Sequence, residues 1–170
     1  MGEAVRAGIA TQVPGAVLSL LRWEELEEMV CGRPEIDIDL LQSTAEYERG
    51  CSSSDPHVLW LWELLRQEFS AEDRKAFVRF AWGRSRLPLT RAAFTQPLKL
   101  QGFSRSSGSG GSVDNYLPVS HTCFFSVEIP RYSSKEILKQ KLLYAVHNCT
   151  AIDGDDTGAG MRAAALGIEM

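Results

Sequence analysis

The stretch at residues 117–133, LPVSHTCFFSVEIPRYS, carries the clearest strand pattern in the chain. Within it, the side chains of CFFSVEI (residues 123–129) alternate between two faces, which is typical of a β-strand. Pro130 ends this strand, because proline lacks the amide hydrogen that a sheet ladder needs. Cys123 therefore lies at a junction between a polar loop and a strand, where side chains at a sheet edge reach solvent.

A helix is predicted directly after this strand. Residues 133–149, SSKEILKQKLLYAVHNC, repeat apolar side chains at helical spacing. Ser133 or Ser134 caps its start, and Glu136 stands three residues after Ser133, as in a capping box. The sequence that follows weakens into Gly and Asp, which is typical of a flexible tail.

Short helices are predicted near the start of the chain. Residues 16–31 repeat apolar side chains close to helical spacing and predict one or two helices. Gly32 and Pro34 stop them. Residues 35–50, EIDIDLLQSTAEYERG, predict another short helix before the glycine that ends this stretch.

Two longer helices follow. Ser54 or Asp55 caps the first, and Pro56 suits its first turn because the missing N–H has no helical partner there. The second begins at Ser70, with Asp73 three residues on as an acidic variant of the capping box. Both carry an apolar stripe at helical spacing. A buried face on each helix is the expected consequence.

The texture then changes from helices to short extended segments. LKLQGF (residues 98–103) predicts a strand, and residues 104–115, SRSSGSGGSVDN, predict a flexible surface loop. That loop lacks the pattern of a phosphate-binding glycine loop. The order of helices, strands and a final helix predicts an α+β fold, a small sheet packed with helices.

Composition narrows the class of protein. The chain has 170 residues, 44% of them hydrophobic, and a formal net charge of −4 with both signs well mixed. That balance argues against nucleic acid as a partner. No apolar run approaches the roughly 20 residues of a membrane span, and the N-terminus lacks a signal-peptide pattern. We expect a soluble, cytoplasmic protein that needs no cofactor.

The chain has four cysteines, Cys31, Cys51, Cys123 and Cys149. A reducing compartment keeps such thiols free, so we expect no disulfides. No two of them form a CxxC pair and no histidine pair stands at zinc-finger spacing, so we expect no metal site. A free cysteine is most often a small buried hydrophobe, and by composition alone that reading also applies to Cys123.

Cys123 has a second reading, as a nucleophile. A nucleophilic cysteine needs exposure and a means of favouring the thiolate. His121 stands two residues before it, and in an extended segment the two side chains point to the same face. A Cys-dependent hydrolase is the weakest alternative, because no second His and no Asn or Asp is placed to complete a triad. A structural role for His121 also stays open.

Motifs resemble one known family. LPVSHTCFF (residues 117–125) resembles the segment of HECT-type ubiquitin ligases that carries the thioester cysteine. FAWGRSRLP (residues 80–88) resembles the family's turn after a helix pair, and residues 24–41 resemble the stretch that joins its two lobes. The resemblance covers roughly residues 4–153 in continuous order. It is strongest toward the large HERC-like members.

The resemblance implies a function. Cys123 would accept ubiquitin from a ubiquitin-conjugating enzyme as a thioester and pass it to a lysine of a protein substrate. His121 and Thr122 match the motif and would shape the loop. The family places an acidic residue near its C-terminus, so Asp153 or Asp155 would act as the acid, with the neighbouring Asp156 a further candidate.

The resemblance also implies a division of the chain. Residues 1–34 would be the end of the N-terminal lobe and a hinge, residues 35–153 the HECT C-lobe, and residues 154–170 an atypical flexible tail without the family's aromatic residue. The surface for the conjugating enzyme belongs to the part of the N-lobe that is missing here. We therefore expect the isolated chain to be impaired. The alternative is a non-catalytic ubiquitin-binding or interaction module derived from a HECT ligase.

Overall fold

Four short strands form one mixed sheet in the computed structural model, which describes residues 2–103 and 112–148. Across the sheet, the strands are β1 (Glu46–Glu48), β2 (Lys99–Gly102), β4 (Ser126–Ile129) and β3 (Val119–His121). The first three run parallel, and β3 is antiparallel to β4. The register places Tyr47, Leu100 and Val127 side by side on one face of the sheet.

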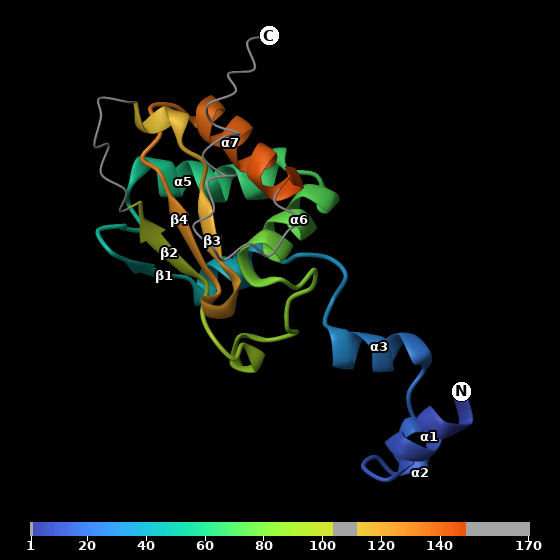
Figure 1. Cartoon of the computed structure of the whole chain (residues 1–170). Coiled ribbons are helices and arrows are strands. Elements are labelled where there is room, and N and C mark those ends of the chain that lie inside the picture. Colours follow the sequence, from blue (N-terminus) through green and yellow to red (C-terminus); the bar gives the residue numbers. More distant parts are fainter. Residues whose placement is uncertain (1, 104–111, 149–170) are drawn as a thin grey trace.

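Helices make up most of the remaining described structure (Figure 1). The α-helices are α1 (Gly2–Ala10), α2 (Gly15–Leu18), α3 (Trp23–Cys31), α4 (Ile38–Thr44), α5 (Pro56–Glu63), α6 (Ala71–Trp82) and α7 (Lys135–Asn148). A π-helical turn, η1 (Leu64–Glu68), extends α5, and there are three 3₁₀ turns, η2 (Arg91–Ala93), η3 (Val113–Asn115) and η4 (Thr122–Phe124). Helices α5, α6 and α7 pack together beside the sheet.

The hydrophobic core lies between one face of the sheet and these three helices. Leu100, Val127 and Ile129 supply the sheet side and are fully buried. The helices contribute an equally inaccessible set, Val58, Leu61, Phe77, Val78, Leu138 and Leu142. Full burial of one such side chain contributes about 1.5–3 kcal/mol, so this interface supplies most of the driving force for folding.

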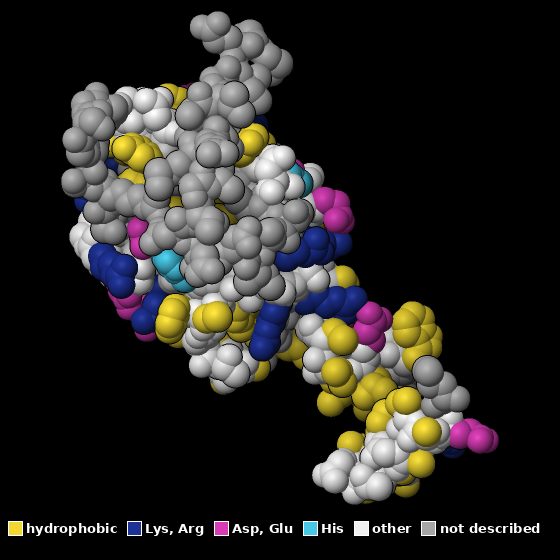
Figure 2. Space-filling model, viewed as in Figure 1, with side chains coloured by type: hydrophobic (Ala, Val, Ile, Leu, Met, Phe, Trp, Pro, Cys, Tyr) yellow, Lys and Arg dark blue, Asp and Glu magenta, His cyan; other side chains and the backbone are white. Residues whose placement is uncertain are grey.

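Helices α1–α3 lie apart from this core, at the lower right of Figure 1. None of the three contains a buried residue, and the core itself begins only at Ile36. We call residues 2–31 the N-terminal arm. Its exposed large apolar side chains are Val5, Ile9, Val17, Leu20, Trp23, Met29 and Val30. Figure 2 shows hydrophobic side chains gathered over this part of the molecule.

The arm joins the core at Gly32 under a tight steric constraint. The φ of Gly32 is +84°, and a Cβ atom there would lie 2.1 Å from the carbonyl oxygen of Leu87. Only glycine fits this position. Arg86 holds the same junction, donating to the Gly32 carbonyl oxygen at 3.2 Å and pairing with Glu27 at 2.6 Å. The segment just after α6 therefore makes the contacts that attach the N-terminal arm.

Most of the predicted elements are present. The α+β class is confirmed, and residues 16–31 form two short helices, α2 and α3. Ser70 and Asp73 make a reciprocal capping box, and Gly83 ends α6 in the left-handed conformation. For α7, the Ser134 hydroxyl accepts from the amide of Ile137, whereas Ser133 bonds to Asp114.

Several boundaries differ from prediction, each for a local reason. The helix predicted in residues 35–50 ends at Thr44, because residues 46–48 pair with β2 as strand β1. Helix α1 and strand β3 were not predicted. Residues 104–111 of the predicted loop lie outside the described residues. No helix within residues 2–103 and 112–148 is long and apolar enough to cross a membrane.

The capping box of α6 gives a stability prediction. Ser70→Ala should lower the free energy of unfolding by about 0.5–2 kcal/mol, because the amide of Asp73 loses its acceptor. Urea unfolding measures this effect. The matched control is Ser53→Ala, an exposed serine with no side-chain hydrogen bond recorded among the described residues. Equal stability of the two variants would contradict the assignment of the cap.

The same box predicts a pH effect. Hydrogen bonds from Ser70, and then from His147, lower the pKa of Asp73 below its ordinary 3.8. A lowered carboxyl pKa stabilises the fold at pH values above 3.8, and this contribution is lost as the pH falls through the lowered pKa. Asp73→Asn should therefore flatten the acid side of the stability profile. An unchanged acid limb would count against this coupling.

Candidate functional site

Cys123 lies in the tight turn between β3 and β4. The 3₁₀ turn η4 (Thr122–Phe124) reverses the chain, so that the side chains of Cys123 and Phe124 are exposed and Phe125 is fully buried. The exposure predicted for Cys123 is confirmed, and the reading as a buried core cysteine is excluded. The predicted start of the strand at Cys123 is wrong, because β4 begins at Ser126.

Phe125 gives this turn its shape. Its backbone is left-handed, with φ 46° and ψ 50°, an outlier for a bulky side chain. Holding a non-glycine residue there costs about 1–3 kcal/mol. Two backbone hydrogen bonds fix it: its amide donates to Thr122 at 3.3 Å, and its carbonyl oxygen accepts from the amide of Lys99 at 2.9 Å. The surrounding structure therefore overrides the local preference of the residue.

An aromatic stack anchors the same residue. The rings of Phe125 and Trp82 lie 4.3 Å apart at an interplanar angle of 9°, and Phe94 stacks on Trp82 at 5.8 Å. The guanidinium of Arg84 lies 4.6 Å from the centre of the Trp82 ring. Such stacking contributes about 0.5–1.5 kcal/mol beyond the area that it buries. The end of α6 thus holds the turn that presents Cys123.

His121 faces a buried carboxylate. Its Nε2 lies 3.3 Å from Oε1 of Glu128, and Arg49 reaches the same oxygen at 3.6 Å. Glu128 is 7% exposed and lies on β4 two residues after Ser126, the residue that pairs with His121. The predicted closeness of His121 and Cys123 on one face of an extended segment does not apply, because the chain turns at residue 122.

The carboxylate of Glu128 continues a polar row across the sheet. Glu48, Gln101 and Glu128 occupy matching register positions on β1, β2 and β4. Gln101 donates to Glu48 at 2.9 Å, as does Lys99 at 2.8 Å. The hydrogen bonds from Lys99 and then Gln101 lower the pKa of Glu48. One face of the sheet is therefore apolar and packed, and the other carries this charged row beside the turn.

The remaining cysteines differ in exposure. Cys31 is exposed on α3, whereas Cys51 is 8% exposed after β1. Four residues considered above lie outside the described residues: Cys149 and the predicted acids Asp153, Asp155 and Asp156. Within the described residues, Cys123 belongs to no cluster of three metal-binding side chains. Its exposure is what a nucleophilic role requires.

Residues 2–153 match the family described as HECT-domain (ubiquitin-transferase). The chain belongs to the HECT family. It is 46% identical to the E3 ubiquitin-protein ligase HERC2 of Mus musculus over 154 residues, which is 90% of this chain and 3% of that protein. It is 37% identical to the E3 ubiquitin-protein ligase ptr1 of Schizosaccharomyces pombe, over 82% of this chain and 4% of that protein.

The match extends to plants. The chain is 33% identical to the E3 ubiquitin-protein ligase UPL1 of Arabidopsis thaliana, over 87% of this chain and 4% of that protein. This HECT chain therefore spans only a few per cent of the length of these curated relatives. The predicted family is confirmed, and so is the predicted similarity to a large HERC-like member.

The two sequence motifs of the family lie next to each other at the turn η4. The HTC of the motif runs from the end of β3 into η4, and the FAWG of the second motif ends at Gly83, beside Thr122. Sequence reasoning missed Glu128, Arg49 and the stacking role of Trp82. A signal existed only for Glu128, since a charged residue within an otherwise apolar strand calls for a partner.

The aromatic anchor can be measured with a double-mutant cycle. Trp82→Leu, Phe125→Leu and the double variant should give a coupling free energy of about 0.5–1.5 kcal/mol in denaturant unfolding. The control pairs Trp82→Leu with Ser70→Ala, at the other end of α6 and roughly 18 Å away by helix rise. Its effects should be additive. Additivity in the aromatic pair would refute the stack as an anchor.

Thiol reactivity should follow exposure. Burial, followed by the charge of Asp55, raises the pKa of Cys51 to about 11. Such a thiol is roughly 100-fold less ionised near neutral pH than a free cysteine. Iodoacetamide should therefore modify Cys31 and Cys123 well before Cys51, as read by peptide mass mapping over time. Unfolding in guanidinium is the control that should equalise the rates. Early labelling of Cys51 in the folded chain would contradict its burial.

Proposed function

We propose that this chain is the ubiquitin-accepting lobe of a HECT-type ubiquitin ligase, with Cys123 as its nucleophile. The observation that carries the proposal is the exposed thiol of Cys123 in the HTCF turn of a HECT family member. Exposure matters because the thiol has to reach a carbonyl on another protein. The partners in this proposal are ubiquitin, a ubiquitin-conjugating enzyme and a protein substrate, in the cytoplasm.

The reaction has two steps. The Cys123 sulfur attacks the carbonyl carbon of the thioester between ubiquitin and the conjugating enzyme, a new S–C bond forms, and the enzyme's sulfur leaves as thiol. A substrate lysine amine then attacks the Cys123 thioester. The C–N bond of an isopeptide forms, the Cys123 thiol is released, and the amine's proton goes to a base. Thiol-for-thiol exchange keeps the energy of the acyl group nearly unchanged while leaving it open to amines.

Residues beside Cys123 have positioning roles in this proposal. Thr122 accepts the hydrogen bond from the amide of Phe125 through its backbone carbonyl and closes the turn. His121 is oriented by the buried carboxylate of Glu128, which Arg49 also approaches. Asp153 or Asp155 remains the proposed acidic residue, whose carboxylate would accept the amine's proton as a general base.

The proposed division of the chain is unchanged: residues 1–34 as the end of the N-lobe and a hinge, 35–153 as the C-lobe and 154–170 as the tail. Support for the first boundary comes from the arm, which has no buried residue, and from the core, which starts at Ile36. The glycine with a positive φ at position 32 lies at that boundary.

The test is transfer of ubiquitin from a charged conjugating enzyme. The chain should form an adduct with ubiquitin that a reducing thiol removes, and Cys123→Ala should abolish it. Cys31→Ala is the matched control, since both cysteines are exposed. The same variants are compared in a chimera that carries a complete N-lobe, where loading should be faster. An adduct that survives Cys123→Ala in the chimera would refute the assignment.

A non-catalytic interaction module is the second candidate function. The observation in its favour is the N-terminal arm, whose large apolar side chains are exposed. This alternative predicts binding to ubiquitin, or to a separate N-lobe, with no thiol-sensitive adduct in either the chain or the chimera. Isothermal titration calorimetry measures this binding, and the presence or absence of the adduct separates the two candidates.

A further inference from the structure

A second cluster of chemically reactive side chains lies in the loop between β1 and α5, separate from Cys123. The sulfur of Cys51, a carboxylate oxygen of Asp55 and a ring nitrogen of His57 all lie within 4.8 Å of one another. The spacing is Cys-x₃-Asp-x-His. Cys51 and His57 are buried and Asp55 is half-buried. Thiolate, carboxylate and imidazole are the three kinds of ligand that zinc takes in proteins.

His57 points independently to a missing ligand. The residue is 3% exposed, and its Nε2 is fully buried with no hydrogen-bond partner among the described residues. An unsatisfied buried polar atom costs about 1–3 kcal/mol, so a native fold usually provides a partner.

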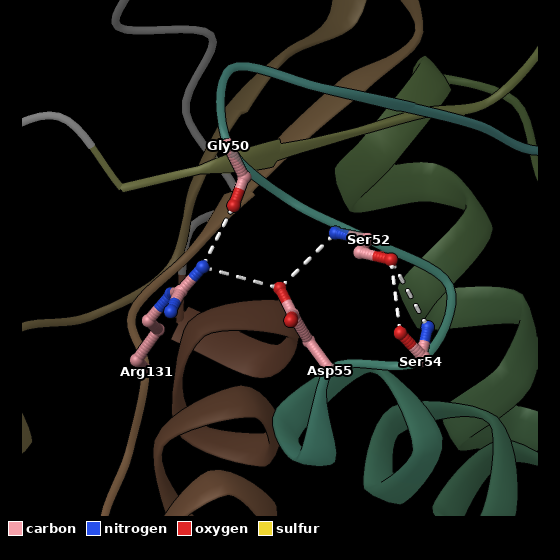
Figure 3. Close-up of polar contacts among 5 residues, drawn as sticks. All are labelled: Gly50, Ser52, Ser54, Asp55 and Arg131. Carbon is pink, nitrogen blue, oxygen red and sulfur yellow. Dashed lines mark hydrogen bonds and ion pairs between the residues drawn. The ribbon is translucent and has the colours of Figure 1, made fainter.

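The side chain of Asp55 does not make the hydrogen bond expected of a helix cap. The residue occupies the N-cap of α5. Oδ2 instead accepts from the amide of Ser52 at 3.0 Å and from Arg131 at 3.3 Å, as Figure 3 shows. Arg131 also donates to the carbonyl oxygen of Gly50 at 2.7 Å. Both of these hydrogen bonds end on Oδ2, so Oδ1 of Asp55 is left to bind a metal ion.

This arrangement matches the way that proteins prepare a metal-binding carboxylate. Carboxylates that bind metals are themselves held by hydrogen bonds from a second layer of groups. Here the backbone of Ser52 and the side chain of Arg131 supply that layer. The positive charge of Arg131 opposes a nearby cation, but its side chain is 63% exposed and therefore screened by solvent.

We propose that Cys51, Asp55 and His57 bind a zinc-like transition-metal ion that fastens the loop between β1 and α5. On binding, the S–H bond of Cys51 breaks, a metal–sulfur bond forms and the proton leaves to solvent. Metal–ligand bonds of about 2.0–2.3 Å place the donors of a tetrahedral site roughly 3.3–3.8 Å apart, inside the 4.8 Å that bounds the three donors here. A water completes four-coordination.

The site has a structural consequence for the Cys123 region. The loop that it fastens begins with Arg49 and Gly50, both with positive φ, of 52° and 77°. Arg49 is the residue that reaches Glu128 beside His121. A metal that holds Cys51 against α5 would therefore hold the backbone from which Arg49 extends. The cluster has no familiar sequence signature, because it contains neither a CxxC pair nor a pair of histidines.

The test uses the full chain and Zn²⁺ itself. After incubation with Zn²⁺ and desalting, mass spectrometry of the metal should show one ion per chain, and Co²⁺ substitution should give a thiolate-to-cobalt charge-transfer band. Cys51→Ser and His57→Gln should each weaken binding at least roughly tenfold. Cys31→Ser and Cys123→Ser, which change the exposed thiols, should keep full binding and the cobalt band.

A thermal readout guards against misfolded variants. Zn²⁺ should raise the midpoint of thermal unfolding of the parent chain and of Asp55→Glu, which retains a carboxylate, but not of His57→Gln. Circular dichroism establishes that each variant is folded. The proposal is overturned if the folded parent chain retains no Zn²⁺ after desalting, or if its retained Zn²⁺ depends on Cys31, Cys123 or Cys149 rather than on Cys51.

Discussion

The stack of Phe125 on Trp82 is the contact on which the presentation of Cys123 depends. A phenylalanine in the left-handed region is unfavourable, and the free energy that holds it there comes from burial of its ring between α6 and the sheet. The sign of φ at this residue decides where the next strand starts. It also decides that Phe124 and Cys123 point outward while Phe125 points inward. The reactive turn is therefore positioned by the core.

The opposite face of the sheet carries hydrogen-bonded polar side chains next to the same turn. Glu48, Gln101 and Glu128 share one row, and each has a hydrogen-bond or charge partner. A buried carboxylate such as Glu128 is tolerable only with such partners. Because His121 is one of them, its imidazole has a defined orientation in the folded chain. The apolar face of the sheet and the charged row thus constrain the turn from its two sides.

Local patterns predicted much of this fold, and contacts between distant residues explain where prediction stopped. Ser70, Asp73 and Gly83 are a local signal, and α6 follows them closely. Strand β1 depends on pairing with β2, which lies some fifty residues later, so no pattern within residues 46–48 reveals it. The same holds for the site: motif and junction pointed to Cys123, whereas Arg49 and Trp82 reach it only through the fold.

The short segment from Gly83 to Leu87 touches two parts of the molecule that the sequence separates widely. At one end, Gly83 lies against Thr122 and Arg84 covers Trp82. At the other end, Arg86 forms an ion pair with Glu27. The carbonyl oxygen of Leu87 occupies the space that a side chain at position 32 would need. Residues 83–87 therefore contact both the attachment of the N-terminal arm and the turn that carries Cys123. A rearrangement at either place involves the same five residues.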